Sequence, residues 1–598
     1  MTSDPPPPAP VPPLATAPVR TRGGSASRRG WLACVALLVI GVVTYLPALR
    51  NSYMLDDYLH HSMIEGTYPA RRSPFDLYNF VSDADRALLF DRGIFPWWSH
   101  PRITIRFFRP LSSALLWADH TALGRRPLLL HLHSFAWLIA AVLAARALFR
   151  SAFSARVTAL ATAIFALAPC HALPIAWLAN REALVSLTFG TLALTAYVRW
   201  RRERRGRDAV AAAGLFVVAM LGGEYGLLFA GYVAAFEWGV RGEQLARRGL
   251  GSLPFVAPAS IYLGVRGALG YGAFGSGYYA DPFRNPGAFF LAAPRRIFTL
   301  LIEGWFTLDG ETLTPTTPFW LLALLALSAA ALLIVPLRRA ITRLEPQPRG
   351  HATWLLLGSV LALVPVLPVV PSPRLLGASI LGVAAAVGVL LDHAWFSPRI
   401  QERSRASELT GFAALILGFA HIIHGPVTAW LTGRHYRHGA GVFARNAAAL
   451  SARLPEGEGS EVFVVRGVSD MLFMPFALDA RGRPPARWLT LTHTGHLLVL
   501  RQDTHTLELV VPRDKSLFPW GGLDLFRGDG ASLRVGDRID RSGVSITILD
   551  VGPAGPCSAR VSFDQDPTSA RRVWVVEDYS GFHAVELPEP GFGVPFDL

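Results

Sequence analysis

Cysteine and lysine are almost absent from this sequence. The three cysteines, Cys34, Cys170 and Cys557, are too few to build a disulfide framework or a cysteine metal cluster. Lys515 is the only lysine, so nearly all of the 57 basic residues are arginines. The sequence also has no glycine-rich phosphate loop, no metalloprotease helix and no nucleophile elbow. These absences argue against the enzyme classes that such motifs define.

Charged residues are scarce as well. They make up 17% of the chain, whereas hydrophobic residues make up 51% and the mean hydropathy is +0.34. This balance is far from that of a soluble protein and predicts a polytopic membrane protein. The net charge of +14 collects in short arginine runs between apolar segments, where it is better explained by helix orientation than by nucleic-acid binding. We therefore expect no nucleic-acid partner.

Eleven apolar runs predict transmembrane helices. The first, residues 31–49, is longer than a signal-peptide core needs and no small-residue cleavage site follows it, so we interpret it as a retained anchor. Residues 1–30 are proline-rich and then arginine-bearing, which predicts a disordered cytoplasmic tail. The other runs lie near residues 127–148, 155–170, 182–198, 209–222, 225–240, 252–268, 318–336, 352–370, 374–392 and 409–431.

The arginines between these runs predict the orientation. With the N-terminus inside, the inside segments hold 23 arginines and the outside gaps after the first loop hold 5. This asymmetry predicts a cytoplasmic N-terminus and an extracytoplasmic C-terminal region, as expected for an integral protein of a bacterial inner membrane. The first outer loop, residues 50–126, is too long for the rule to apply, and its stretch 107–123 predicts an interfacial helix. The runs 209–222 and 225–240 could also form one long helix.

From about residue 433 the pattern changes to short alternating runs separated by glycine, proline and aspartate. It predicts a β-rich extracytoplasmic domain over residues 433–598, a sandwich or open barrel preceded by a helix near 440–454. The predicted fold class is therefore a mainly α polytopic membrane bundle of about 11 transmembrane helices in residues 31–432, with a C-terminal extracytoplasmic β-rich domain. The strands are expected near residues 461–466, 488–492, 497–501, 507–511, 532–535, 544–551, 559–563 and 573–577.

The unusual polar residues share the predicted outer side. Carboxylates near a bilayer lose hydration, and arginine binds phosphate well, so these residues are candidates for a site that holds a charged lipid head group. The alternatives are local roles, such as helix capping by the aspartates or by Glu224 and pairing of Arg181 with Glu182. The candidates are Asp56, Asp57, Arg109, His171, Arg181, Glu182, Glu224 and Arg374.

Two histidines follow the aspartates at helical spacing. Asp57 and His61 are four residues apart, as are Asp56 and His60, so a helix would place each pair as possible metal ligands. No third ligand follows at a fixed spacing, so we expect no cofactor, although a divalent metal stays open. The imidazoles are better interpreted as substrate donors or interface residues.

Six short motifs follow one another along the chain: Leu55-Asp56-Asp57-Tyr58, Phe108-Arg109-Pro110-Leu111, Leu130-His131-Leu132-His133, the segment 169–182, Gly223-Glu224 and Pro373-Arg374-Leu375-Leu376. Their order resembles the GT-C superfamily of membrane glycosyltransferases, and within it the protein O-mannosyltransferase-like branch. The resemblance covers about residues 30–430. The sequence departs from that branch at Asn180, where the branch has glycine, at Gly223, where it has lysine, and after Arg374, where its tyrosine is absent.

The resemblance implies an inverting glycosyltransferase. Such an enzyme takes a sugar from a polyprenyl-phosphate donor in the membrane and transfers it to a protein or glycan acceptor on the outer face. Asp57 or Asp56 would be the general base, and we favour Asp57. The other six candidates would bind the donor phosphate or the substrate. Two alternatives stay open: a transporter or flippase, and a non-catalytic scaffold. Against the transporter, most acidic residues lie at helix ends, and the sequence shows no paired broken helices of the kind that inverted repeats contain.

Overall fold

The computed structural model describes residues 25–597, apart from 240–244, 284, 311–316, 397–403, 456–458, 468–471, 520–523, 529–531, 542 and 579–580. Most of the predicted N-terminal tail, residues 1–30, lies outside the described residues. The chain divides into two compact units, Met1–Val43 and Thr44–Leu598. Helix α1 (Ser25–Leu49) crosses this division, and every other described element belongs to the second unit.

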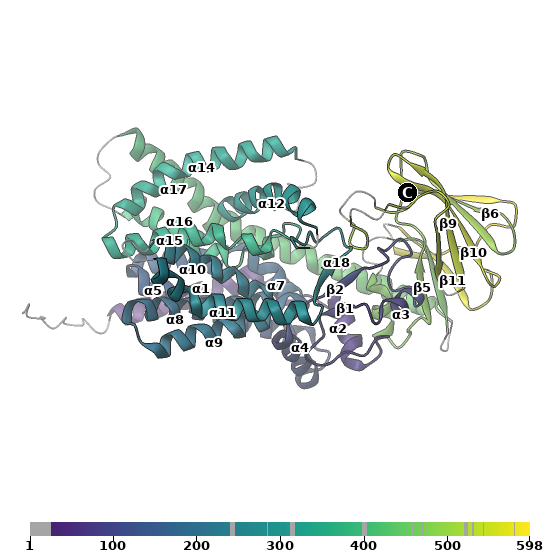
Figure 1. Ribbon diagram of the computed structural model, residues 1–598, viewed down its shortest axis with the longest axis horizontal. Helices are drawn as coiled ribbons and strands as arrows, with labels where there is room; N and C mark the ends of the chain where they lie inside the picture. Colours follow the sequence, from purple (N-terminus) through teal and green to yellow (C-terminus); the bar gives the residue numbers. More distant parts are fainter. Residues whose placement is uncertain are drawn as a thin grey trace, which may run out of the picture. The chain divides into compact units, whose positions relative to one another are not determined.

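Residues 127–453 of the second unit are mostly helical (Figure 1). Helix α16 lies at the centre of this part and is buried from Ser379 to Leu391, as expected for a helix that is apolar on all sides. The helices are α5 (Pro127–Ala152), α6 (Ala155–Ala166), α7 (Ala172–Ala176), α8 (Glu182–Glu203), α9 (Gly206–Gly222), α10 (Phe229–Gly239), α11 (Leu245–Ala268), α12 (Pro286–Phe306), α14 (Phe319–Thr342), α15 (Pro346–Leu361), α16 (Ser379–Phe396), α17 (Arg405–Phe419) and α18 (Gly425–Arg453).

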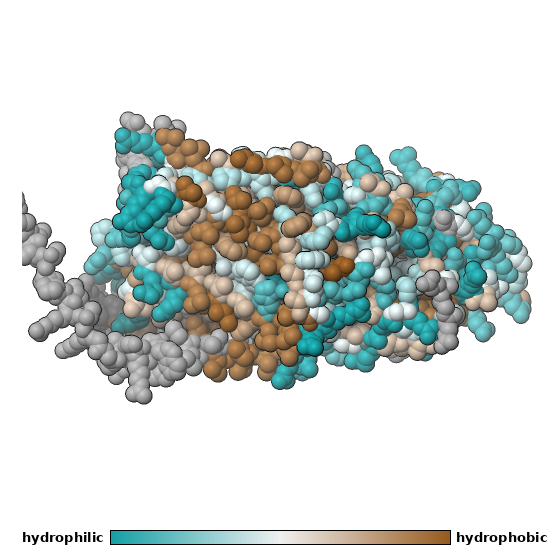
Figure 2. Space-filling model, turned by 90° about the horizontal axis from the view of Figure 1, so that it is seen from below, coloured by the Kyte–Doolittle hydropathy of each residue, from teal (hydrophilic) through white to brown (hydrophobic). Residues whose placement is uncertain are grey.

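The outer surface of these helices is apolar. Figure 2 shows a broad band of hydrophobic side chains over the helical region and mainly hydrophilic ones over the strands. Leu143, Leu327 and Ile334 are each at least 60% exposed, although in water such side chains would be costly. A surface of this kind suits contact with lipid.

Among the residues that the structure describes, six helices are long and apolar enough to cross a membrane, or seven if the bent pair α6 and η1–α7 (Pro169–Ala176) counts as one span. The sequence prediction of eleven spans therefore exceeds what helix length and composition support. Helices α9 and α10 have 17 and 11 residues, fewer than the roughly 20 that a span needs. The six are Pro127–Ala152, Leu178–Glu203, Phe319–Thr342, Pro346–Val366, Ser379–Phe396 and Arg405–Arg453.

The predicted first outer loop, residues 50–126, is folded rather than irregular. It contains α2 (Asp56–Glu65), α3 (Arg86–Asp91) and α4 (Pro110–Leu123), and the last of these confirms a helix within 107–123. Strands β1 (Asn79–Val81) and β2 (Thr104–Arg106) join β3 (Gly272–Phe274) in an antiparallel sheet. This sheet and helix α12 were not expected, and they give structure to the predicted outer gap 269–317.

The C-terminal region contains two sheets, which confirms its β-rich character. A six-stranded sheet has the order β13-β6-β7-β10-β9-β8, and a four-stranded sheet has the order β12-β11-β4-β5. The expected strand at 532–535 does not form; the chain turns at Gly536, which has a φ of +90°, and β8 follows. The elements are β4 (Glu461–Arg466), α19 (Met474–Asp479), β5 (Arg487–Thr490), β6 (His496–Arg501), β7 (Thr506–Val510), β8 (Arg538–Arg541), β9 (Val544–Gly552), β10 (Gly555–Phe563), β11 (Arg572–Asp578), β12 (Gly581–Ala584) and β13 (Gly593–Asp597).

The first outer loop and the β-rich region share one hydrophobic core. The indole Nε1 of Trp97 donates to the carbonyl oxygen of Leu491 at 2.8 Å, and the amide of Trp488 donates to the carbonyl of Arg92 at 3.1 Å. Helix α18 runs without interruption through the predicted domain boundary at 432/433. The predicted boundary at 432/433 therefore stays a prediction. The shared core joins the first outer loop to the strands of the β-rich region.

Candidate active site

The two aspartates begin helix α2 and have different surroundings. Asp57 is buried, and its carboxylate accepts hydrogen bonds from the backbone amides of Met54 at 3.1 Å and Ala179 at 2.8 Å. Asp56 is partly exposed and makes no hydrogen bond or ion pair among the described residues. Leu55, just before them, has a φ of 48°, a strained conformation for a leucine that turns the chain into the helix.

Arg109 joins two glutamates from different helical segments. Its Nη1 donates to Glu182 Oε1 at 3.0 Å, and its Nε donates to Glu224 Oε2 at 2.7 Å. Its guanidinium also lies over the rings of Tyr78 and Phe107. A planar cation held in this way has a fixed orientation, and it brings α4, α8 and the segment η3 (Glu224–Leu228) together.

Arg374, in the segment η5 (Pro373–Leu376), makes no hydrogen bond or ion pair within the part of the chain that the structure describes. Its guanidinium carbon lies 5.3 Å from the centre of the Trp177 ring. It lines a small hollow, together with His171, Tyr225 and Phe229. An arginine without an anionic partner in such a hollow is available to bind an anion.

Asp56 lies near this arginine. Burial raises the pKa of Asp56 to about 7; Arg374 and Arg109 oppose that rise, and Glu182 adds to it. Burial also raises the pKa of Asp57 to about 7, against the hydrogen bonds from Met54 and Ala179. A carboxyl group with a pKa near 7 changes its protonation state in the range where a general base works best.

Arg181 is placed apart from this group. Its guanidinium donates to Ser134 Oγ and to the carbonyl of Leu130, both at 2.8 Å, and it forms an ion pair with Asp119. Asp119 also contacts His133 Nδ1 at 2.8 Å. Arg181 is buried and holds α8 against α4 and α5, which is a structural role.

His171 has a similar local role. Its Nε2 lies 3.0 Å from the carbonyl oxygen of Phe165, and the residue is buried. It still lines the hollow that Arg374 enters, so it shapes this space without offering a charge.

The structure thus brings together Asp56, Arg109, Glu182, Glu224 and Arg374, with Asp57 directly beside them. Sequence reasoning did not select Tyr225 and Tyr279, which interact electrostatically with Arg374. Tyr225 follows Glu224 directly and offered a signal. Tyr279 lies in the long gap 269–317 and reaches the site through a β-bridge to Val369 that no local pattern indicates.

The chain is similar to known proteins only at the level of solved structures among the comparisons made with family models, curated proteins and structures. No protein-family model matches the chain, and no curated protein matches it. The archaeal oligosaccharyltransferase AglB from Archaeoglobus fulgidus, in complex with an inhibitory peptide and a dolichol-phosphate, matches 77% of this chain with 15% identity and a TM-score of 0.43. ArnT from Cupriavidus metallidurans, bound to undecaprenyl phosphate, matches 77% of this chain and 86% of its own, with 15% identity and a TM-score of 0.38.

Both are GT-C membrane glycosyltransferases, and the likeness to them is at low identity. The matched part of AglB is 64% of its own length, so this chain spans less than two thirds of that protein. The O-mannosyltransferase-like branch stays a prediction. The functional inference that follows depends on the geometry of this chain's own residues.

Proposed function

We propose that this chain is an inverting glycosyltransferase that moves a sugar from a polyprenyl-phosphate donor to a protein or glycan acceptor on the outer face of the membrane. The observation that carries the proposal is that the Asp56 carboxylate lies close enough to the Arg374 guanidinium to be affected by its charge, although neither side chain forms a hydrogen bond or ion pair among the described residues. The transfer needs two charged groups: a base for the acceptor hydroxyl, which Asp56 would supply, and a cation for the donor phosphate, which Arg374 would supply.

Asp56 is the base in this proposal, although the sequence favoured its neighbour. The carboxylate of Asp57 already accepts two backbone amides, so it has less capacity to take a proton from a substrate. Asp56 has no such partners. Asp57 instead fixes the start of α2 against the segment η2 (Leu178–Arg181), and that contact orients Asp56.

The transfer step then runs as follows. The acceptor hydroxyl gives its proton to the Asp56 carboxylate while its oxygen attacks the anomeric carbon. The bond between the anomeric carbon and the phosphate oxygen breaks, and the polyprenyl phosphate leaves with the electron pair. Arg374 faces the charge that develops on the leaving phosphate. Attack opposite to the leaving group inverts the anomeric configuration.

The remaining residues orient the sugar. Glu182 Oε2 is buried and has no hydrogen-bond partner among the described residues, while its other oxygen accepts from Arg109 and Asn180. A buried acceptor of this kind suits a sugar hydroxyl. Glu224 and Arg109 hold Glu182 in place, and we assign them a positioning role. Arg181 and His171 belong to the structural support.

The test is sugar transfer from polyprenyl-phosphate sugars by purified wild type, Asp56→Asn and Asp57→Asn. Asp56→Asn keeps the size of the side chain but removes the proton acceptor, so we expect the rate to fall by about 10²–10⁴-fold. Asp57→Asn should retain more activity. An Asp56→Asn enzyme as active as wild type would contradict the mechanism and favour the transporter.

Binding of undecaprenyl phosphate tests the role of Arg374 separately. Arg374→Ala removes a charge-assisted contact to the phosphate and should weaken binding by about tenfold or more, because hydrogen bonds to charged groups contribute about 1.5–3 kcal/mol. Arg102→Ala, an exposed arginine of the first outer loop, is the matched control and should bind as wild type. Equal binding by both variants would remove Arg374 from the site.

A further inference from the structure

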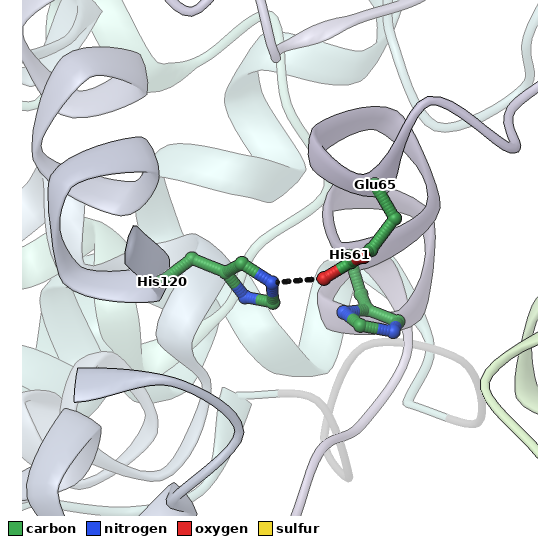
Figure 3. A group of neighbouring side chains, drawn as sticks. All are labelled: His61, Glu65 and His120. Carbon is green, nitrogen blue, oxygen red and sulfur yellow. Dashed lines mark hydrogen bonds and ion pairs between the residues drawn. The ribbon is translucent and has the colours of Figure 1, made fainter. Parts of the chain in front are cut away.

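A second group of polar side chains lies on the first outer loop, outside the site described above. His61 and Glu65 come from α2, and His120 comes from α4 (Figure 3). One ring nitrogen of each histidine and one carboxylate oxygen of Glu65 all lie within 4.8 Å of one another. His120 Nε2 is 2.7 Å from Glu65 Oε1, and the two imidazole rings have centres 5.0 Å apart.

His61 is the member of this group that needs an explanation. It is 3% exposed, and its Nδ1 has no hydrogen-bond partner among the described residues. A buried ring nitrogen without a partner costs free energy. The neutral imidazole ring has a lone pair to offer a cation.

The ligand set indicates which cation. Two imidazoles and one carboxylate suit Zn²⁺, which takes three protein ligands and a water in its open sites, whereas Mg²⁺ and Ca²⁺ prefer oxygen ligands. Ligand atoms around a tetrahedral zinc lie about 3.3 Å apart, so small side-chain rotations close the present spacing. The spacing of His61 and Glu65, four residues apart on one helix, places both on the same face.

We propose that His61, Glu65 and His120 bind Zn²⁺ and that the ion joins α2 to α4. Helix α2 begins with Asp56, and α4 begins directly after Arg109, so the ion would fix the two elements that carry these residues. The role is structural, and the proposal does not depend on glycosyl transfer. It replaces the pairing of Asp57 with His61 that the sequence suggested, because the Asp57 carboxylate is engaged by backbone amides.

The charges around the group include one that opposes a cation. Arg125 Nη2 lies 3.7 Å from Glu65 Oε1, and its side chain is 53% exposed. Its exposure lets it move away when zinc enters, and its removal should favour the metal. The Glu65 side chain is 41% exposed, so the ion can reach the group from solvent.

The experiment titrates ZnCl₂ into the full chain, purified in detergent and stripped with a chelator. We expect one equivalent of tightly bound zinc by mass spectrometry of the metal content, and Co²⁺ in its place should give the visible absorption of a tetrahedral site. Glu65→Gln and His120→Ala should each weaken zinc binding by more than the 10–100-fold that loss of a second-shell partner costs. Arg125→Ala should bind zinc more tightly.

His438→Ala removes an exposed histidine of α18 and controls for adventitious binding; it should bind zinc as wild type does. Glu65 is exposed enough that Glu65→Gln should not disturb folding, so its zinc affinity can be measured. Wild type that holds no zinc after desalting, or Glu65→Gln and His120→Ala with wild-type affinity, would overturn the proposal. Displacement of zinc by millimolar Mg²⁺ would overturn the assignment of the ion.

Discussion

Asp56 and Asp57 are adjacent in the chain, but their carboxylates face different surroundings. Asp57 lies under the backbone of the segment η2, where two amides donate to it. Asp56 faces Arg374, Arg109 and Glu182. We therefore expect Asp57 to stabilise the fold, whereas Asp56 is the base in the proposed mechanism.

This difference predicts unequal effects of the two alanine substitutions on stability. Asp57→Ala leaves the amides of Met54 and Ala179 without acceptors, and each unsatisfied buried amide costs about 1–3 kcal/mol. Asp56→Ala removes no hydrogen bond. We expect a clearly lower midpoint of thermal denaturation in detergent for Asp57→Ala and little change for Asp56→Ala. Equal loss in both variants would show that the two carboxylates share the structural role.

The raised pKa of Asp56 predicts a pH profile. The base must be ionised, so kcat/KM should fall about tenfold per pH unit below about 7 and level off above it. Arg374 lowers the pKa of Asp56, so the midpoint should move to higher pH in Arg374→Ala. Arg102→Ala, which does not act on Asp56, should leave it in place. A profile flat from pH 5 to 8 would exclude Asp56 as the base.

The sequence contained the candidate residues but not their grouping. Helix-end position and predicted sidedness were enough to select Asp56, Arg109, Glu182 and Arg374. They could not separate Arg181 from Arg374, because both are arginines that open a predicted helix on the same side. The three-dimensional structure places Asp119 beside Arg181, whereas Arg374 forms no ion pair with any described residue.

At the scale of elements, the close contact between the first outer loop and strand β5 can be tested by a single substitution. Gly93 has a φ of +72°, and a Cβ there would lie 1.5 Å from the carbonyl oxygen of Trp488. Gly93→Ala therefore forces the loop away from β5, and we expect a lower denaturation midpoint and faster proteolysis of the loop.

Gly66→Ala is the matched control for this prediction. Gly66 also has a left-handed φ, +80°, but a Cβ there would meet no atom within 4 Å. Its cost should be only the roughly 1–2 kcal/mol of the left-handed conformation. If the two variants lost the same stability, the packing of the loop on β5 would be wrong.

The sequence predicted those helices and strands that have a local hydrophobic pattern and missed those that lack one. Apolar runs and alternating runs are local signals, so most helices and β4, β6, β7, β9 and β11 were expected close to their observed places. Helix α12 was not expected, because Arg295 and Arg296 interrupt its apolar pattern. Strands β12 and β13 have only 4 and 5 residues. They form by pairing with β11 and β6, and their own sequences carry little pattern.

For the whole molecule, the prediction concerns the number of membrane crossings between two positions in the chain. An odd number places the two positions on opposite sides of the membrane, and an even number places them on the same side. Of the described helical segments between Arg207 and Gly439, four are long and apolar enough to span, and an even number would place both positions on the same side. The topology predicted from the sequence, with 23 arginines inside and 5 outside, has α9, α10 and α11 cross as well. Three more spans make the number odd and place the two positions on opposite sides.

Reporter fusions after Arg207 and after Gly439 measure this parity. We expect a fluorescent cytoplasmic reporter to work after Arg207 and an alkaline phosphatase, which needs the oxidising outer compartment, to work after Gly439. Reporters active on the same side would show that an even number of segments crosses, and they would place the β-rich region and Arg207 in one compartment.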